Sequence, residues 1–175
     1  RTTEMNLQAL ADSLEISFLA NKLKYSNVML AHQTVYKTDY NIGMLTEVLR
    51  YVEERKLLHV PSVAIYYYGY KASTEKSNPE HFRNLKDHIF KYDELFTTVE
   101  RRDIYLLAIN YLISKMNAGD ASAIRELFEF YKKGLDKKVW IENDIISRFT
   151  FRNLVSLGLS LNEYEWVENF ILDYE

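Results

Sequence analysis

The sequence predicts an all-α fold in which antiparallel helix hairpins stack as a short right-handed α-α superhelix. Apolar residues recur at intervals of three or four in successive segments of the 175-residue chain. Only 5 Gly and 2 Pro occur, which is too few for a β fold with many turns. The last two helix hairpins also repeat one apolar pattern at a fixed offset, which is typical of helix-pair solenoids.

The chain length predicts a single helical-repeat domain spanning residues 1–175, and the composition is that of an ordinary globular protein. Hydrophobic residues make up 47% of the chain and charged residues 27%, so there is enough apolar surface for a core. The first residue is Arg rather than Met, which allows the chain to be a fragment of a longer protein.

The first third of the chain predicts helix, but its division is open. Residues 5–30 contain neither Gly nor Pro and keep the helical rhythm. A capping box of Asp12 and Glu15 would divide this stretch, so one long helix and two shorter ones both fit. Residues 32–41 lose the rhythm and are predicted to connect to the next helix, Ile42–Glu54.

Proline marks the start of the next two predicted helices. Pro61 stands where a first helical turn accepts it, and a tyrosine-rich helix follows as far as Ala72. After a polar stretch, Asn78-Pro79-Glu80 combines a capping side chain, a proline at the first position and an acid in the first turn.

The second half contains the clearest helical pattern. Residues 101–116 are apolar on nearly every face, which predicts a helix buried between neighbours. This helix is expected to end at Gly119, with Asp120 capping the next one. After a polar link, residues 149–160 form another predicted helix, and Asn162 is expected to cap the last.

An offset of 43 residues superimposes the last two hairpins. It places Tyr111 on Leu154 and Leu127 on Phe170, and the match lies in apolar position more than in identity. One hairpin cannot bury both of its faces, so stacking on a neighbour supplies the missing cover.

The end of one helix and the body of the next carry a family resemblance, through Leu157-Gly158, Tyr164, Trp166, Val167 and Phe170. These residues resemble the tetratricopeptide (TPR) superfamily in its loose, TPR-like form. No proline closes the hairpin, and Phe151 is bulky where a small residue is expected, so the strict signature is not met. Segments 17–25, 60–68 and 166–174 also resemble an uncharacterised bacterial helical-repeat family, and this resemblance implies no known activity.

Composition argues against several classes of function. The net charge is −3 and no concentrated basic surface is evident, so we expect no nucleic-acid partner. Cysteine is absent, which excludes disulfides, thiolate catalysis and Cys-based zinc sites. No stretch is apolar and long enough to predict a membrane span. The sequence does not determine the location of the protein, and the cytoplasm is the location that we favour.

No residue pattern predicts catalysis, a cofactor or a metal. His81 and His88 are seven residues apart, whereas a helical zinc pair is three or four apart. There is no glycine-rich phosphate loop. We therefore expect a protein that is not an enzyme, with no cofactor.

The predicted function is a protein–protein interaction or scaffold module. In a solenoid, the inner helices of each pair line a concave groove that binds a peptide or a domain. The inner helices here would be 42–54, 101–116 and 149–160. The predicted partner-binding residues are Arg50, Asn110, Arg148, Arg152, Asn153, Tyr67 and Tyr68.

Two other functions fit the same sequence. A small-ligand sensor or enzyme could have a pocket between hairpins, near the tyrosine-rich helix with His59 and His81. A segment that only spaces domains in a longer protein is a third possibility. The run Tyr66-Tyr67-Tyr68 fits either a peptide-binding wall or simple hairpin packing.

Overall fold

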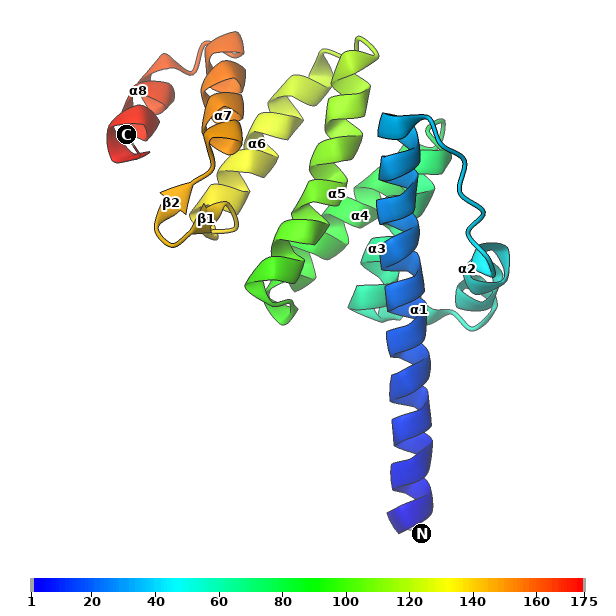
Figure 1. Ribbon diagram of the computed structural model, residues 1–175. Helices are drawn as coiled ribbons and strands as arrows, with labels where there is room; N and C mark the ends of the chain where they lie inside the picture. Colours follow the sequence, from blue (N-terminus) through cyan, green and yellow to red (C-terminus); the bar gives the residue numbers. More distant parts are fainter. Residues whose placement is uncertain (1, 175) are drawn as a thin grey trace. The chain divides into compact units, whose positions relative to one another are not determined.

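A computed structural model describes residues 2–174 and confirms the all-α fold (Figure 1). The helices are α1 (Thr2–Tyr36), α2 (Leu45–Glu54), α3 (Pro61–Thr74), α4 (Pro79–Tyr92), α5 (Thr98–Asn117), α6 (Ser122–Asp136), α7 (Arg148–Ser160) and α8 (Tyr164–Tyr174). Two short 3₁₀ helices, η1 (Leu57–His59) and η2 (Asp93–Leu95), and two short strands, β1 (Ile141–Glu142) and β2 (Ile145–Ile146), complete the described elements. The chain forms two compact units, unit 1 (Arg1–Tyr92) and unit 2 (Asp93–Glu175).

Helix α3 is the centre of unit 1. It packs against α1 and α4, and its middle residues from Val63 to Tyr67 are all buried. Pro61 occupies its first turn, and the Asn78 side chain accepts a hydrogen bond from the Glu80 backbone N–H at the start of α4 (3.1 Å). The proline and capping signals therefore predicted both helix starts correctly.

Helix α1 is one continuous helix rather than two. Asp12 accepts a hydrogen bond from the Gln8 side chain one turn earlier and does not cap a second helix. Helix α1 also continues through the first residues of the predicted 32–41 connection and ends at Tyr36, where Lys37 adopts a left-handed φ of 52°. Ring contacts of His32 with Tyr36 and Tyr40 accompany this last turn.

Helix α1 packs into unit 1 from near its middle onward, beginning at Glu15, which accepts a hydrogen bond from the Tyr51 hydroxyl on α2. Leu19, Leu23 and Asn27 are buried, and the Asn27 amide donates to the backbone oxygen of Tyr66 on α3 (2.9 Å). The first half projects beyond the other helices of unit 1 (Figure 1), and its large apolar side chains are exposed.

Unit 2 contains two helix hairpins. Helix α6 packs against both α5 and α7, and α7 packs against α8. Helix α5 begins with a complete capping box, in which the Thr97 side chain accepts from the Glu100 N–H and the Glu100 carboxylate accepts from the Thr97 N–H. Helix α5 exceeds the predicted 101–116 segment by three residues at its start and one at its end.

The turns of the two hairpins have the same backbone hydrogen bonds, 43 residues apart. Gly119 N–H donates to Met116 and Asp120 N–H to Lys115, just as Asn162 N–H donates to Leu159 and Glu163 N–H to Gly158. This is the Schellman pattern, with its left-handed residue at Gly119 (φ 92°) and Asn162 (φ 60°).

The role predicted for Asn162 was therefore wrong. It ends α7 by adopting the left-handed conformation, and its side-chain oxygen accepts from the Tyr164 hydroxyl (2.7 Å) rather than from a backbone N–H of α8. Asn is the residue other than Gly that tolerates the left-handed conformation best. An Asn between two helices can therefore either end the first helix or cap the second.

The link between the hairpins is not simply polar, because it contains a small β-hairpin. Strands β1 and β2 pair antiparallel, with Ile141 opposite Ile146. The two turn residues, Asn143 and Asp144, both have positive φ values (51° and 61°), as a type I′ turn requires.

A buried carboxylate anchors the start of unit 2. Asp93 is 1% exposed, and its carboxylate accepts hydrogen bonds from the Tyr105 hydroxyl and the Lys137 ammonium, each at 2.7 Å. Burial and the hydrogen bond to Asp93 raise the pKa of the Tyr105 hydroxyl. The contact joins η2, α5 and the end of α6.

Candidate functional site

An apolar pocket of about 400 Å³ lies between α5, the β-hairpin and the start of α7. We call it the α5–α7 pocket. Its lining residues are Arg102, Leu106, Trp140, Glu142, Ile145, Ser147 and Thr150.

Local interactions hold the walls of the α5–α7 pocket in place. The Arg102 guanidinium donates to the backbone oxygen of Val139 (3.1 Å) and to the Glu142 carboxylate (3.1 Å), which ties α5 to β1. On the opposite wall, the Ser147 hydroxyl accepts from the Thr150 N–H (3.1 Å) and caps α7.

Trp140 forms the buried floor of the α5–α7 pocket. Its indole N–H donates to the backbone oxygen of Tyr131 (2.9 Å), and its ring meets that of Tyr105 edge-on. The ring lies over Gly134 so closely that a Cβ atom there would stand 2.3 Å from the indole nitrogen. Position 134 on α6 is therefore glycine, because any larger residue would clash with the Trp140 indole ring.

The α5–α7 pocket has solvent-facing apolar side chains beside a charged rim. Among its lining residues, Ile145 is 69% exposed and Leu106 is 37% exposed. The Arg102–Glu142 ion pair borders this patch. Such a pocket suits an apolar side chain flanked by polar groups.

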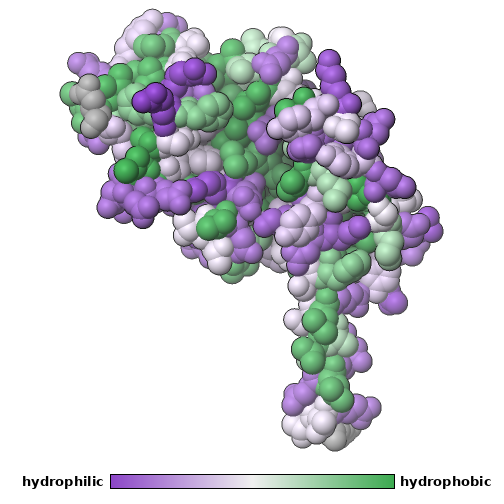
Figure 2. Space-filling view, viewed as in Figure 1, coloured by the Kyte–Doolittle hydropathy of each residue, from purple (hydrophilic) through white to green (hydrophobic). Residues whose placement is uncertain are grey.

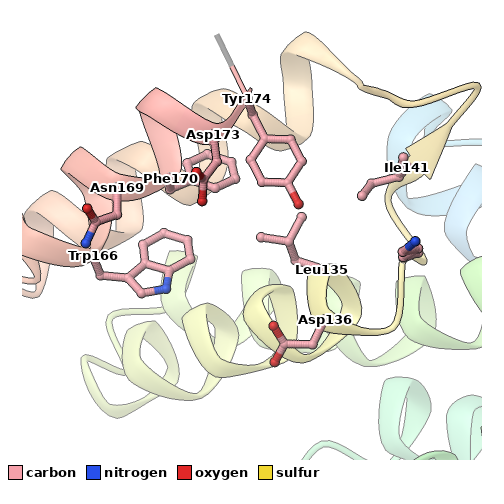
Figure 3. A pocket seen from close by; sticks show the side chains of 9 residues that line it. Leu135, Asp136, Ile141, Trp166, Asn169, Phe170, Asp173 and Tyr174 are labelled. Carbon is pink, nitrogen blue, oxygen red and sulfur yellow. The ribbon is translucent and has the colours of Figure 1, made fainter.

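A second pocket, of about 310 Å³, lies between α6 and α8 (Figure 3). Trp166, Phe170 and Tyr174 follow one another along α8, with Leu135 and Asp136 of α6 facing them. Neighbouring rings of this row contact each other, with centroids 5.1 and 5.2 Å apart. The Lys132 ammonium already lies over the Trp166 ring (5.6 Å), so much of this aromatic surface is used in packing.

Four of the predicted binding residues lie in unit 2. Arg148 and Arg152 are exposed on α7, and Asn110 is exposed on α5. Asn153 is half-buried, and its amide donates to the Tyr131 hydroxyl on α6 (3.0 Å), so it contributes to hairpin packing.

The other three predicted binding residues lie in unit 1. Arg50 is exposed on α2. Tyr67 is buried, and its hydroxyl donates to the Glu53 carboxylate on α2 (2.6 Å), while its ring meets that of Tyr68 edge-on. Tyr68 is half-buried, with its ring near those of His81 and His88 on α4.

Polar groups near the tyrosine-rich helix are paired with one another. Lys71 forms ion pairs with Glu53 (3.6 Å) and Glu75 (2.8 Å), and Glu75 also contacts His81 (2.8 Å). The hydrogen bond from Lys71 lowers the pKa of the Glu75 carboxyl, with a further contribution from His81. Burial, followed by the bond to Glu53, raises the pKa of Tyr67. These contacts hold α2, α3 and α4 together.

The structure adds no metal-binding group to this picture. Within residues 2–174, no cluster of three or more His, Asp or Glu side chains could hold a metal ion. His59 is exposed, and its Nδ1 atom pairs with the backbone oxygen of Lys56 (2.8 Å).

Sequence reasoning missed the apolar members of the α5–α7 pocket. Leu106 belongs to a helix that is apolar on several faces, and periodicity alone did not show which face stays open. Ile145 follows the Asn143-Asp144 pair, and that pair between isoleucine-containing segments was the available signal for a hairpin.

Comparisons with protein-family models, curated proteins and solved structures yielded no match. Across residues 2–174, every helix is too short or too polar to cross a lipid bilayer. The case for a function therefore rests on the geometry of the described residues.

Proposed function

We propose that the chain is a protein-interaction module without catalytic activity, and that the α5–α7 pocket is its peptide-binding site. The observation that carries this proposal is the pair of exposed apolar side chains, Leu106 and Ile145, that line this pocket. Apolar side chains that stay in water on a rigid support are typical of a recognition surface.

The position of the pocket supports the proposal. It lies on α5 and α7, the helices that the 43-residue repeat makes equivalent, and the inner helices of a solenoid line its groove. We infer that the hairpins of unit 2 stack in a TPR-like superhelix. The matching Schellman turns at Gly119 and Asn162 support this arrangement.

The side chains around the α5–α7 pocket suggest which partner would bind. An apolar residue of an extended peptide would fill the space above Trp140. An acidic residue next to it would pair with Arg148, which is exposed beside Ser147 in the first turn of α7. The partner is therefore a peptide segment with an apolar anchor and a neighbouring carboxylate.

A peptide-selection experiment tests this function. Random peptides would be selected on the intact chain, and we expect the selected sequences to share an apolar residue next to Asp or Glu. The substitutions Leu106→Asp and Ile145→Asp would each weaken binding by about tenfold or more, because they place a charge against the apolar anchor.

Leu172→Asp is the matched control. Leu172 is 71% exposed on α8 and does not line the α5–α7 pocket, so binding should not change. The proposal fails if no peptide is selected. It also fails if the selected peptides bind the Leu106 and Ile145 variants as tightly as the unchanged protein.

A further inference from the structure

Helix α1 carries an exposed apolar stripe along most of its length. The stripe comprises Leu7, Leu10, Leu14, Phe18, Tyr25 and Val28, each between 51% and 63% exposed. Figure 2 shows apolar surface running along the projecting half of the helix. Exposed apolar surface of this extent and regularity marks an interaction site.

The stripe lies on the side of α1 that faces away from unit 1. Residues on a helix are about 100° apart, so Leu14 and the buried Leu23 point in opposite directions. Leu19, Leu23 and Asn27 hold α1 against α3. The packing within unit 1 therefore leaves the whole stripe open to a partner.

The charges of α1 differ between its two halves, and this difference indicates the kind of partner that fits. Between residues 2 and 21 the charged residues are Glu4, Asp12 and Glu15, all acidic. Between residue 22 and the end of α1 at Tyr36 they are Lys22 and Lys24, both basic. A helix with an acidic first half and a basic second half complements a second copy of itself that runs in the opposite direction.

We propose that two copies of this chain associate through α1 as an antiparallel helix pair. Leu7 of one copy would lie near Val28 of the other, because Phe18 stands close to the midpoint of the stripe. Glu15 and Lys22 lie on the same flank of the stripe, seven residues apart, and in an antiparallel pair matching flanks meet. Each Lys22 would then face the Glu15 of the other copy, whose carboxylate also accepts a hydrogen bond from Tyr51 of α2 in its own chain.

Measurement of mass in solution tests the association. The intact chain should have twice its chain mass of 20.8 kDa at micromolar concentration. Leu14→Gln combined with Phe18→Gln should make it monomeric, because both changes place polar groups on the stripe while keeping residues that are compatible with a helix. Met5→Gln is the matched control, since Met5 is 68% exposed on the same helix but points away from the stripe.

Single introduced cysteines test whether the two α1 helices run antiparallel. The chain contains no cysteine of its own, so only the introduced ones can be cross-linked. A mixture of Leu7→Cys and Val28→Cys proteins should be linked by a short bismaleimide, whereas neither protein alone should be linked. Linking of each variant with itself would indicate a parallel pair and overturn the proposal. A chain that stays monomeric, or a dimer that survives the double Gln substitution, would also overturn it.

Discussion

The two units use different means to hold their helices together. In unit 1, contacts join residues distant in sequence, such as Asn27 with Tyr66 and Tyr67 with Glu53. In unit 2, one local turn is used twice, at Gly119 and at Asn162, with the same backbone hydrogen bonds. The repeated turn fixes the local geometry of each hairpin, whereas long-range contacts are still needed to hold each hairpin against its neighbours.

Unit 2 also has a long-range anchor, and its removal should have the largest effect on stability. Asp93→Ala would leave the buried Tyr105 hydroxyl and the Lys137 ammonium without their acceptor. We expect the free energy of unfolding to fall by about 3 kcal/mol in urea denaturation. Glu94→Ala is the control, because Glu94 is exposed and 3.9 Å from Lys137, and it should change stability by less than about 0.5 kcal/mol.

Two glycines lie in close contact with a neighbouring side chain, and their substitution should give the next largest loss of stability. A Cβ atom at Gly158 would stand 2.4 Å from Val167 on α8, and one at Gly134 would stand 2.3 Å from Trp140. Gly158→Ala and Gly134→Ala should each lower the free energy of unfolding by about 1–3 kcal/mol, despite the helix preference of Ala. Gly43 in unit 1 has nothing within 4 Å of such an atom, so Gly43→Ala should cost nothing. Equal stability of all three variants would show that Gly134 and Gly158 are not closely packed against Trp140 and Val167.

The two matching turns should respond to the same substitution in the same way. Gly119→Ala and Asn162→Ala each force Ala into the left-handed conformation, and each should lower stability by about 1 kcal/mol. Asn162→Gly should be nearly neutral, because glycine tolerates this backbone. Thermal or urea unfolding would measure the three changes, and tolerance of Ala at either position would break the equivalence.

The smallest expected effect is a difference in titration between the residues that follow these turns. The hydrogen bond from the Ser122 side chain lowers the pKa of Asp120, whereas the hydrogen bond from Arg125 lowers that of Glu163. Each carboxyl therefore favours the folded state above its ordinary pKa, and this contribution disappears as the pH falls through the lowered value.

Carboxyl titration by NMR can separate the two causes. Ser122→Ala should raise the pKa of Asp120 only, and Arg125→Gln should raise that of Glu163 only. A shift of both carboxyls in either variant would show that the two turns are coupled.

Local signals in the sequence were sufficient for most helix boundaries. Pro61, the Asn78 cap and Gly119 act through the backbone of their own turn, so their effect is visible without knowledge of the packing. The capping box of Thr97 and Glu100 is equally local and could have been recognised from its spacing.

The candidate site was harder to predict, because it depends on which helix faces meet. Asn153 has a suitable polar side chain, but packing of α7 on α6 directs it to Tyr131. Leu106 has the periodicity of a core residue, yet it remains partly exposed beside the β-hairpin. Periodicity indicates that a face is apolar, but the neighbouring element decides whether that face is covered.

The two tryptophans of the chain allow the most direct test of the proposed binding site. Trp140 lines the α5–α7 pocket and Trp166 lines the α6–α8 pocket, so their indole N–H signals in an NMR spectrum report on the two pockets separately. Addition of a selected peptide should shift the Trp140 signal and leave that of Trp166 in place. A shift of Trp166 alone, or of neither signal while the peptide is bound, would contradict the assignment of the site.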